Sequence, residues 1–159
     1  MQVSLKLFLQ SGRLNQLQVG MTEEQIIELC GSPEMVGGTS PYYSRPTIFK
    51  FGNLETHFSY FLPRICTTLF VDYETNLAHL EMPASFDVQE WDLSRNADRD
   101  EVEVYLHQNE IEYEIYSQSG DMLPVIIISS SGVTISFDDD NVISAISINI
   151  DRGVPYMLV

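Results

Sequence analysis

A short capped helix that occurs twice is the feature that most constrains how this chain folds. The segment GMTEEQIIELCGSP, residues 20–33, carries the signals of a complete helix. Thr22 is a favourable N-cap, and Gln25 completes a capping box in which each side chain bonds to the other residue's backbone N–H. Met21 and Ile26 occupy the two positions of a hydrophobic staple. The segment is therefore predicted to form a short amphipathic helix.

A second segment, ADRDEVEVYLHQN at residues 97–109, carries the same helix signals with different residues. Asp98 takes the N-cap position and Glu101 closes the capping box, while Ala97 and Val102 take the staple positions. The offset between the two caps is 98 minus 22, or 76 residues. The sequence thus predicts two equivalent helices.

Two later strand patterns correspond in the same way. NLETHFS from Asn53 matches GVTISFD from Gly132, an offset of 79, and LFVDYE from Leu69 matches ISINID from Ile146, an offset of 77. Three matches in the same order, at nearly constant spacing, indicate an internal duplication.

Each copy is typical of a helix followed by antiparallel strands, which predicts an α+β fold of two tandem helix-plus-antiparallel-sheet units. The first unit spans 1–81, a linker 82–96, and the second unit 97–159. A single joint sheet and two separate sheets both fit this pattern. The predicted strands are Thr47–Phe51, Asn53–Ser59, Thr67–Tyr73, Glu110–Tyr116, Val125–Ser130, Val133–Phe137 and Val142–Ile150, with turns at SSSG and DDDN. The VIII run at 125–128 lacks alternation and is expected in a central strand buried on both faces.

The helix segment at 20–33 resembles the G-M-T-x-x-Q-V-x-x-x-L-G-x-P signature of the BamE (SmpA/OmlA) lipoproteins, whose fold is shared with the β-lactamase inhibitor protein. Cys30 stands where that pattern has Leu. The chain lacks the lipobox cysteine of those lipoproteins and the disulfides of the inhibitor. The resemblance implies a tandem helix-plus-sheet fold that grips other proteins through one sheet face.

Charge excludes several classes of partner. The formal net charge is −15. Residues 1–80 hold 7 acids and 5 bases, whereas the rest of the chain holds 16 acids and 3 bases, which gives −2 and −13. Such a chain repels phosphate backbones and anionic lipid, so neither nucleic acid nor membrane is an expected partner. The excess favours a basic protein partner, although solubility alone explains such asymmetry equally well.

The N-terminus and the cysteines indicate a cytoplasmic protein. The segment MQVSLKLFLQSGR has too short an apolar run for a signal peptide, and no apolar run approaches the length that spans a bilayer. Cys30 and Cys66 are expected to be separate, reduced and buried.

No motif requires an enzyme, a cofactor or a metal. Glu55 and His57 project from one strand face, but two ligands do not complete a coordination shell, so a surface charge pair is the favoured interpretation. The DDDN segment at 138–141 lacks the ligand spacing of a calcium loop and is expected to be a solvated turn. We therefore expect neither catalytic nor metal-binding residues.

The strand EIEYEIY at 110–116 offers the best candidate binding surface. Alternation directs Ile111, Tyr113 and Ile115 to the core and leaves a row of carboxylates ending in an aromatic ring. Acids at the start of the second helix and in the DDDN turn are expected to extend this row, and a tryptophan is a second candidate anchor, although it fits packing over the sheet better. The predicted partner-binding residues are Glu110, Glu112, Glu114, Tyr116, Asp98, Asp100, Glu101, Glu103 and Trp91.

These features lead to a non-enzymatic protein-binding module. The favoured hypothesis is a small acidic inhibitor of the immunity-protein type that neutralises a basic protein partner. The alternative is a self-associating or assembly module, a homodimer in which a sheet edge pairs with another copy. A metal-dependent hydrolase is the least favoured hypothesis.

Overall fold

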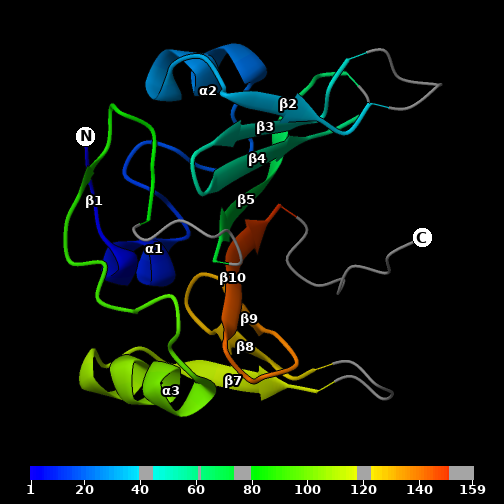
Figure 1. Ribbon diagram of the computed structural model, residues 1–159. Coiled ribbons are helices and arrows are strands. Elements are labelled where there is room, and N and C mark those ends of the chain that lie inside the picture. Colours follow the sequence, from blue (N-terminus) through cyan, green and yellow to red (C-terminus); the bar gives the residue numbers. More distant parts are fainter. Residues whose placement is uncertain (40–44, 61, 74–79, 118–122, 151–159) are drawn as a thin grey trace.

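An eight-stranded antiparallel sheet dominates the α+β fold of the computed structural model, which describes residues 1–39, 45–60, 62–73, 80–117 and 123–150 (Figure 1). The helices in this part of the chain are α1 (Leu5–Ser11), α2 (Glu23–Cys30) and α3 (Arg99–Gln108). The strands are β1 (Gln2–Val3), β2 (Met35–Gly37), β3 (Ile48–Phe51), β4 (Leu54–Phe58), β5 (Cys66–Asp72), β6 (Asp87–Val88), β7 (Tyr113–Tyr116), β8 (Val125–Ile128), β9 (Thr134–Phe137) and β10 (Ile143–Asn149). The sheet order is β2-β3-β4-β5-β10-β9-β8-β7.

Both predicted capping boxes are confirmed. At the start of α2, the Gln25 N–H donates to Thr22 Oγ1 and the Thr22 N–H donates to Gln25 Oε1, over 3.4 and 2.9 Å. At the start of α3, the Glu101 N–H donates to Asp98 Oδ1 and the Asp98 N–H to Glu101 Oε2, over 2.9 and 3.1 Å. Each box satisfies backbone donors that have no partner inside the helix.

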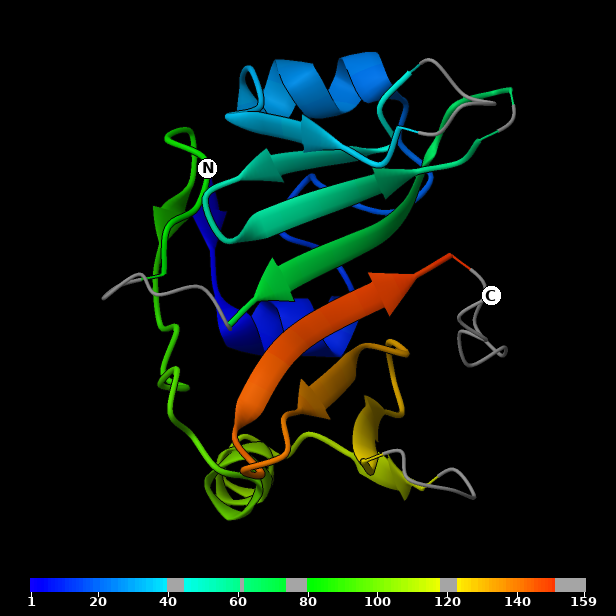
Figure 2. The same ribbon diagram turned by 45° about the vertical axis from the view of Figure 1, so that its right-hand side comes forward.

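One continuous sheet joins the two halves of the chain, which decides the alternative that the sequence left open. The junction is the antiparallel pairing of β5 with β10, where Leu69 lies opposite Ile148 and Val71 opposite Ile146. In both figures β5 and β10 run side by side through the middle of the molecule (Figures 1 and 2). Without this pairing, β5 and β10 would each be an exposed edge strand.

Hydrogen bonds beside the junction recur at a constant spacing. The Tyr73 N–H donates to the Ser144 carbonyl over 2.8 Å, and the Ile150 N–H donates to the Thr67 carbonyl over 2.8 Å. Adding 77 to 73 gives 150, and adding 77 to 67 gives 144. The two bonds therefore exchange places when the halves of the chain are exchanged.

The start of each helix is tied to the last strand of its own half. The Cys66 N–H donates to the Met21 carbonyl over 2.7 Å, and the Ile143 N–H donates to the Ala97 carbonyl over 3.0 Å. Met21 and Ala97 each precede an N-cap, so the same backbone contact fixes α2 against β5 and α3 against β10.

The predicted strand at 110–116 begins later than expected. β7 starts at Tyr113, because the C-terminus of α3 uses the preceding residues. The Glu110 N–H donates to the His107 carbonyl, the Ile111 N–H donates to the Leu106 carbonyl, and Glu110 has a positive φ of 57°. Glu110 thus ends the helix and is not a strand residue, which corrects its predicted place in the carboxylate row.

The VIII run at 125–128 was predicted wrongly as a strand buried on both faces. It forms β8, second from the sheet edge, with Ile126 and Ile128 buried but Val125 and Ile127 only half-buried. Ile126 and Ile128 face the core, whereas Val125 and Ile127 face the side of the sheet with the polar residues of β9 and β10. Burial of β8 on one side only explains the difference.

The sheet has a covered face and an open face. On the covered face, buried side chains from each of the three helices pack with those of the strands into one core, which includes Phe8, Ile26 and Leu106. The open face, seen towards the viewer in Figure 2, carries the alternate residues of each strand. Its longest row, read across the paired strands, is Met35, Lys50, Glu55, Phe70, Ser147, Thr134, Ile127 and Glu114.

The N-terminal segment, for which no helix was predicted, packs across the two halves. α1 begins at the N-cap Ser4 and ends at Gly12, whose φ of 69° suits glycine. The Ser131 hydroxyl donates to the Leu9 carbonyl, and a Cβ on Gly12 would clash with Ile148, so α1 lies tightly against the second half. The helix has only seven residues, too few to show a helical period in the sequence, and its burial depends on contacts with residues far along the chain.

The segment at 82–96, predicted as a linker, is partly built into the fold. β6 pairs in parallel with β1, and Phe86 and Leu93 are buried in the core. Cys30 and Cys66 are also buried and form no disulfide, as expected, and burial raises the pKa of each thiol to about 12. None of the helices in the described ranges has the length and apolar character needed to cross a bilayer. Residues 151–159, placed in the second unit by the sequence, lie outside the described residues.

Candidate functional site

Ten carboxylates gather at one end of the molecule, which we call the acidic end. They lie on α3, on β7 and the residues before it, and in the turn between β9 and β10, all at the bottom of Figure 1. The bridge between Asp98 and Val142 and the hydrogen bond from the Arg99 N–H to the Asn141 carbonyl bring the start of α3 against that turn. The ten residues are Asp98, Asp100, Glu101, Glu103, Glu110, Glu112, Glu114, Asp138, Asp139 and Asp140.

Some of these carboxylates already have structural roles. Asp98 and Glu101 form the capping box of α3, and Asp138 accepts the N–H groups of Asp140 and Val142 within the turn. Glu103 accepts from Arg99 Nε over 2.9 Å and from the Tyr113 hydroxyl over 3.0 Å. Because these carboxylates are held by hydrogen bonds within the protein, they would act on a partner mainly through their negative charge and less through direct hydrogen bonds.

The remaining carboxylates are better placed for direct contact. Asp100, Glu110, Glu112, Glu114, Asp139 and Asp140 are all exposed. Among the described residues, the ion pair within the acidic end is Arg99–Glu103. Because residues 81–159 hold 16 acids and only 3 bases, most of the negative charge in this half of the chain is uncompensated. Uncompensated charge of one sign attracts a partner of the opposite sign over several ångströms.

The carboxylate row on β7 is shorter than the sequence predicted. Glu112, Glu114 and Tyr116 alternate along the chain and share the open face, where Glu114 lies opposite Ile127. Ile115, expected in the core, is 45% exposed. It points to the covered face beside Ile126, but β7 is the edge strand, so less of the protein covers it.

The acidic end is a corner of the molecule and not a flat wall. Glu112 and Glu114 project from the open face, whereas α3 packs on the covered face through Val102, Tyr105 and Leu106. The contact between Glu103 and the Tyr113 hydroxyl joins these two sides. A partner would have to wrap around this corner to contact both sets of acids.

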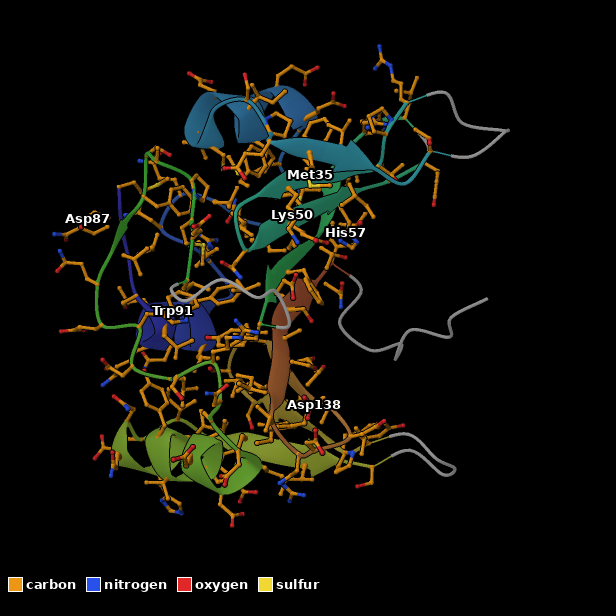
Figure 3. The ribbon with its side chains drawn as sticks, viewed as in Figure 1. Met35, Lys50, His57, Asp87, Trp91 and Asp138 are labelled. Carbon is orange, nitrogen blue, oxygen red and sulfur yellow. The ribbon has the colours of Figure 1, made fainter. Side chains whose placement is uncertain are left out.

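Trp91 does not belong to the acidic end. Its ring is half-buried and stacks on Phe8 with a centroid distance of 6.5 Å, and its Nε1–H donates to the Tyr73 hydroxyl. Figure 3 shows it beside α1, above α3 and away from the acidic end. This is the packing that the sequence favoured over partner contact, and it leaves Tyr116, 43% exposed, as the aromatic group on the candidate surface.

A second group of charges lies on the open face of the first half, and we call it the open-face cluster (Figure 3). Lys50 Nζ lies 3.0 Å from Glu55 Oε1 and 3.0 Å from Asp72 Oδ2. The other oxygen of Glu55 lies 3.3 Å from His57 Nε2. The His57 ring in turn stacks on Phe70. Three neighbouring strands, β3, β4 and β5, therefore contribute to one connected network.

The network shifts the pKa values of two of its members. The hydrogen bond from His57, aided by Lys50 and opposed by partial burial, lowers the pKa of Glu55 to about 2. Burial disfavours the charged form of Lys50, but its bonds to Glu55 and Asp72 outweigh this effect and raise its pKa. A carboxylate with so low a pKa is a weak base at neutral pH, which disfavours an acid-base role for Glu55.

Sequence reasoning identified only half of the open-face cluster. Glu55 and His57 are two residues apart on one strand, and alternation alone places them together. Lys50 and Asp72 join them through the registers that pair Lys50 with Glu55 and Glu55 with Phe70, two residues from Asp72. Among the described residues, no group of three or more His, Cys, Asp or Glu side chains is arranged to hold a metal ion.

Replacing Glu55 is expected to lower stability in a pH-dependent way. Because the folded-state pKa of about 2 lies below the ordinary value of 4.5, ionised Glu55 stabilises the fold fully above about pH 4.5, and this contribution is lost as the pH falls towards 2. We expect Glu55→Gln to lower the free energy of unfolding by about 1 kcal/mol at pH 7, a figure reduced for solvent screening. Urea denaturation at pH 7 and pH 3 measures this difference.

The control for this experiment is Glu28→Gln, which removes an exposed carboxylate from α2. It should change the free energy of unfolding by less than about 0.5 kcal/mol at both pH values. A Glu55→Gln difference from wild type that is as large at pH 3 as at pH 7 would contradict the assigned network.

Comparisons with known family models, curated proteins and solved structures found no match. The assignment of function therefore depends on the surfaces described above.

Proposed function

We propose that the protein is a non-enzymatic protein-binding module, a small acidic inhibitor of the immunity-protein type that neutralises a basic protein partner. The observation that supports this most is the acidic end, where ten carboxylates gather and where Arg99–Glu103 is the ion pair within the described residues. A field of this kind accelerates encounter with a basic partner and disfavours nucleic acid and anionic membranes.

A tandem architecture is part of the same proposal. The first unit is 1–81 and the second 97–159, with 82–96 between them. Support comes from the hydrogen bonds that recur at an offset of 77, from the two capping boxes, and from the symmetrical strand order about β5 and β10. Duplication followed by divergence would leave one unit nearly neutral and the other strongly anionic.

The open face of the sheet supports a binding role for the same module. The resemblance of residues 20–33 to the BamE and β-lactamase inhibitor protein pattern implies that partners are gripped through a sheet face, and here one face lacks helices in the described part of the chain. Glu112, Glu114 and Tyr116 continue the acidic end onto that face. A basic side chain bonded to these carboxylates, beside the ring of Tyr116, is the contact we propose.

Neutralising exposed carboxylates of the acidic end is expected to slow binding. The partner is first captured from native lysate on immobilised wild-type protein, identified and purified. A triple variant, Glu112→Gln, Glu114→Gln and Asp139→Asn, should then reduce its association rate constant about 10-fold at low salt, because such charges act mainly on the encounter rate. Surface plasmon resonance at two ionic strengths measures the rate and its salt dependence.

The matched control removes the same number of charges elsewhere. Glu28→Gln, Glu81→Gln and Asp87→Asn change exposed positions outside the acidic end, and this variant should keep the association rate within about 3-fold of wild type. If both triple variants slowed association equally, the total net charge would be the cause and not the position of the charges at the acidic end. Capture of only acidic partners would refute the proposal.

A further inference from the structure

We propose that strand β2 pairs antiparallel with β2 of a second copy, so that the protein is a homodimer held by one sheet edge. This inference is independent of the proposed inhibitor function. It concerns the edge of the sheet farthest from the acidic end, since β2 and β7 are the two outermost strands.

The edge strand β2 is exposed and apolar. It pairs with β3 only, so one side of its backbone has no strand partner in the described sheet. Its side chains Met35 and Val36 are 65% and 58% exposed although both are large and apolar. No charged residue occurs from 35 to 44 in the sequence. Natural edge strands are protected by short length, a charge, a proline or a bulge. β2 is only three residues long, but it carries no charge, proline or bulge.

The opposite edge strand shows the protection that β2 lacks. The register places Val36 beside Phe49 and Ile115 beside Ile126, so Val36 and Ile115 hold equivalent positions on the two edges. Ile115, however, is followed by Tyr116 and preceded by Glu114, and Glu112 lies just before the strand. Glu114 on β7 and Glu112 just before it therefore oppose the pairing of β7 with another copy. β2 also has one carboxylate just before it, Glu34, but within the strand Met35 occupies the position equivalent to Glu114.

The distribution of charge also favours a second copy over a basic partner at the β2 edge. The first half of the chain carries −2 and the second half −13, so most like-charge repulsion between two copies comes from their acidic ends. Contact through β2 places these ends on the far sides of the dimer, while contact through β7 would bring them together. A basic partner has no charge to steer it to the uncharged β2.

Antiparallel pairing of β2 with its own copy is compatible with two-fold symmetry. A strand that pairs antiparallel with its own copy forms an isologous interface, in which the same surface is used on both sides. Val36, at the centre of β2, would lie near the symmetry axis. The two eight-stranded sheets would then form one continuous sheet, with an acidic end free at each extremity for a partner.

The test is the mass of the full chain in solution. With a chain mass of 18.1 kDa, twice which is 36.2 kDa, sedimentation equilibrium of wild type over a micromolar concentration series should show the dimer mass at the upper end. Val36→Lys places a charge on the edge and should shift the mass to that of the monomer. Ile115→Lys, the equivalent change on β7, should leave the dimer intact.

Circular dichroism is used to check that each variant is folded. Met35→Lys provides a second test charge on β2 and should also give monomer. Raising the salt concentration should leave the wild-type dimer unchanged or strengthen it, because repulsion between the acidic ends is screened. Wild type that is monomeric throughout the series would overturn the proposal. So would a dimer that Ile115→Lys dissociates and Val36→Lys does not.

Discussion

Phe8→Ala is expected to lower the free energy of unfolding by about 3 to 5 kcal/mol, one of the two largest effects anticipated for a single substitution in this protein. Phe8 is completely buried on α1, and its ring stacks on Trp91. The substitution removes apolar contacts from a helix that packs against both halves of the chain.

The neighbouring residue supplies the control. Leu7 lies on the same helix but is 61% exposed, so Leu7→Ala should change the free energy of unfolding by less than about 0.5 kcal/mol. Chemical denaturation followed by far-ultraviolet circular dichroism measures both values. Similar small losses for the two variants would mean that α1 does not pack as described.

Leu69→Ala and Ile146→Ala are each expected to cost about 2 to 5 kcal/mol. Leu69 on β5 and Ile146 on β10 are fully buried on the covered face, where these two strands join the halves of the sheet. Leu69 and Ile146 are 77 residues apart. Leu69 lies opposite Ile148, and Ile146 lies opposite Val71, which is itself 77 residues before Ile148. The two losses should therefore agree within about 1 kcal/mol.

Ser147→Ala is the matched control, because Ser147 lies on β10 next to Ile146 but projects onto the open face. Its effect should be below about 0.5 kcal/mol. If Ile146→Ala were as mild as Ser147→Ala while Leu69→Ala was severe, the two halves would not share an equivalent junction. Because β5 and β10 belong to one sheet, both core variants should still unfold in a single transition.

The sequence predicted most of the acidic end correctly but misplaced Glu110 in a strand. Chain order placed Asp98, Asp100 and Glu101 at the start of a helix, and the capping box made that start unambiguous. Strand alternation placed Glu112, Glu114 and Tyr116 on one face, but it also included Glu110 because alternation cannot show where a helix gives way to a strand. The positive φ at Glu110 and its bond to His107 belong to the helix end.

What the sequence by itself determined was the local structure with strong periodic or capping signals: both capped helices and six of the seven predicted strands lie where their residues predicted them, and the seventh begins three residues late. These elements depend on contacts within a few residues, which the order of side chains specifies directly. The charge asymmetry between the two halves was equally plain.

Only the tertiary structure decided how the halves meet, which strands lie at the edges and what covers each face. The pairing of β5 with β10, the place of α1 against Ser131 and the network of Lys50, Glu55 and Asp72 all join residues that are far apart in the chain or on different strands. Strand register is set by side-chain packing and backbone bonding across the whole sheet, so no local pattern specifies it. For the same reason β8 proved to be buried on one side only.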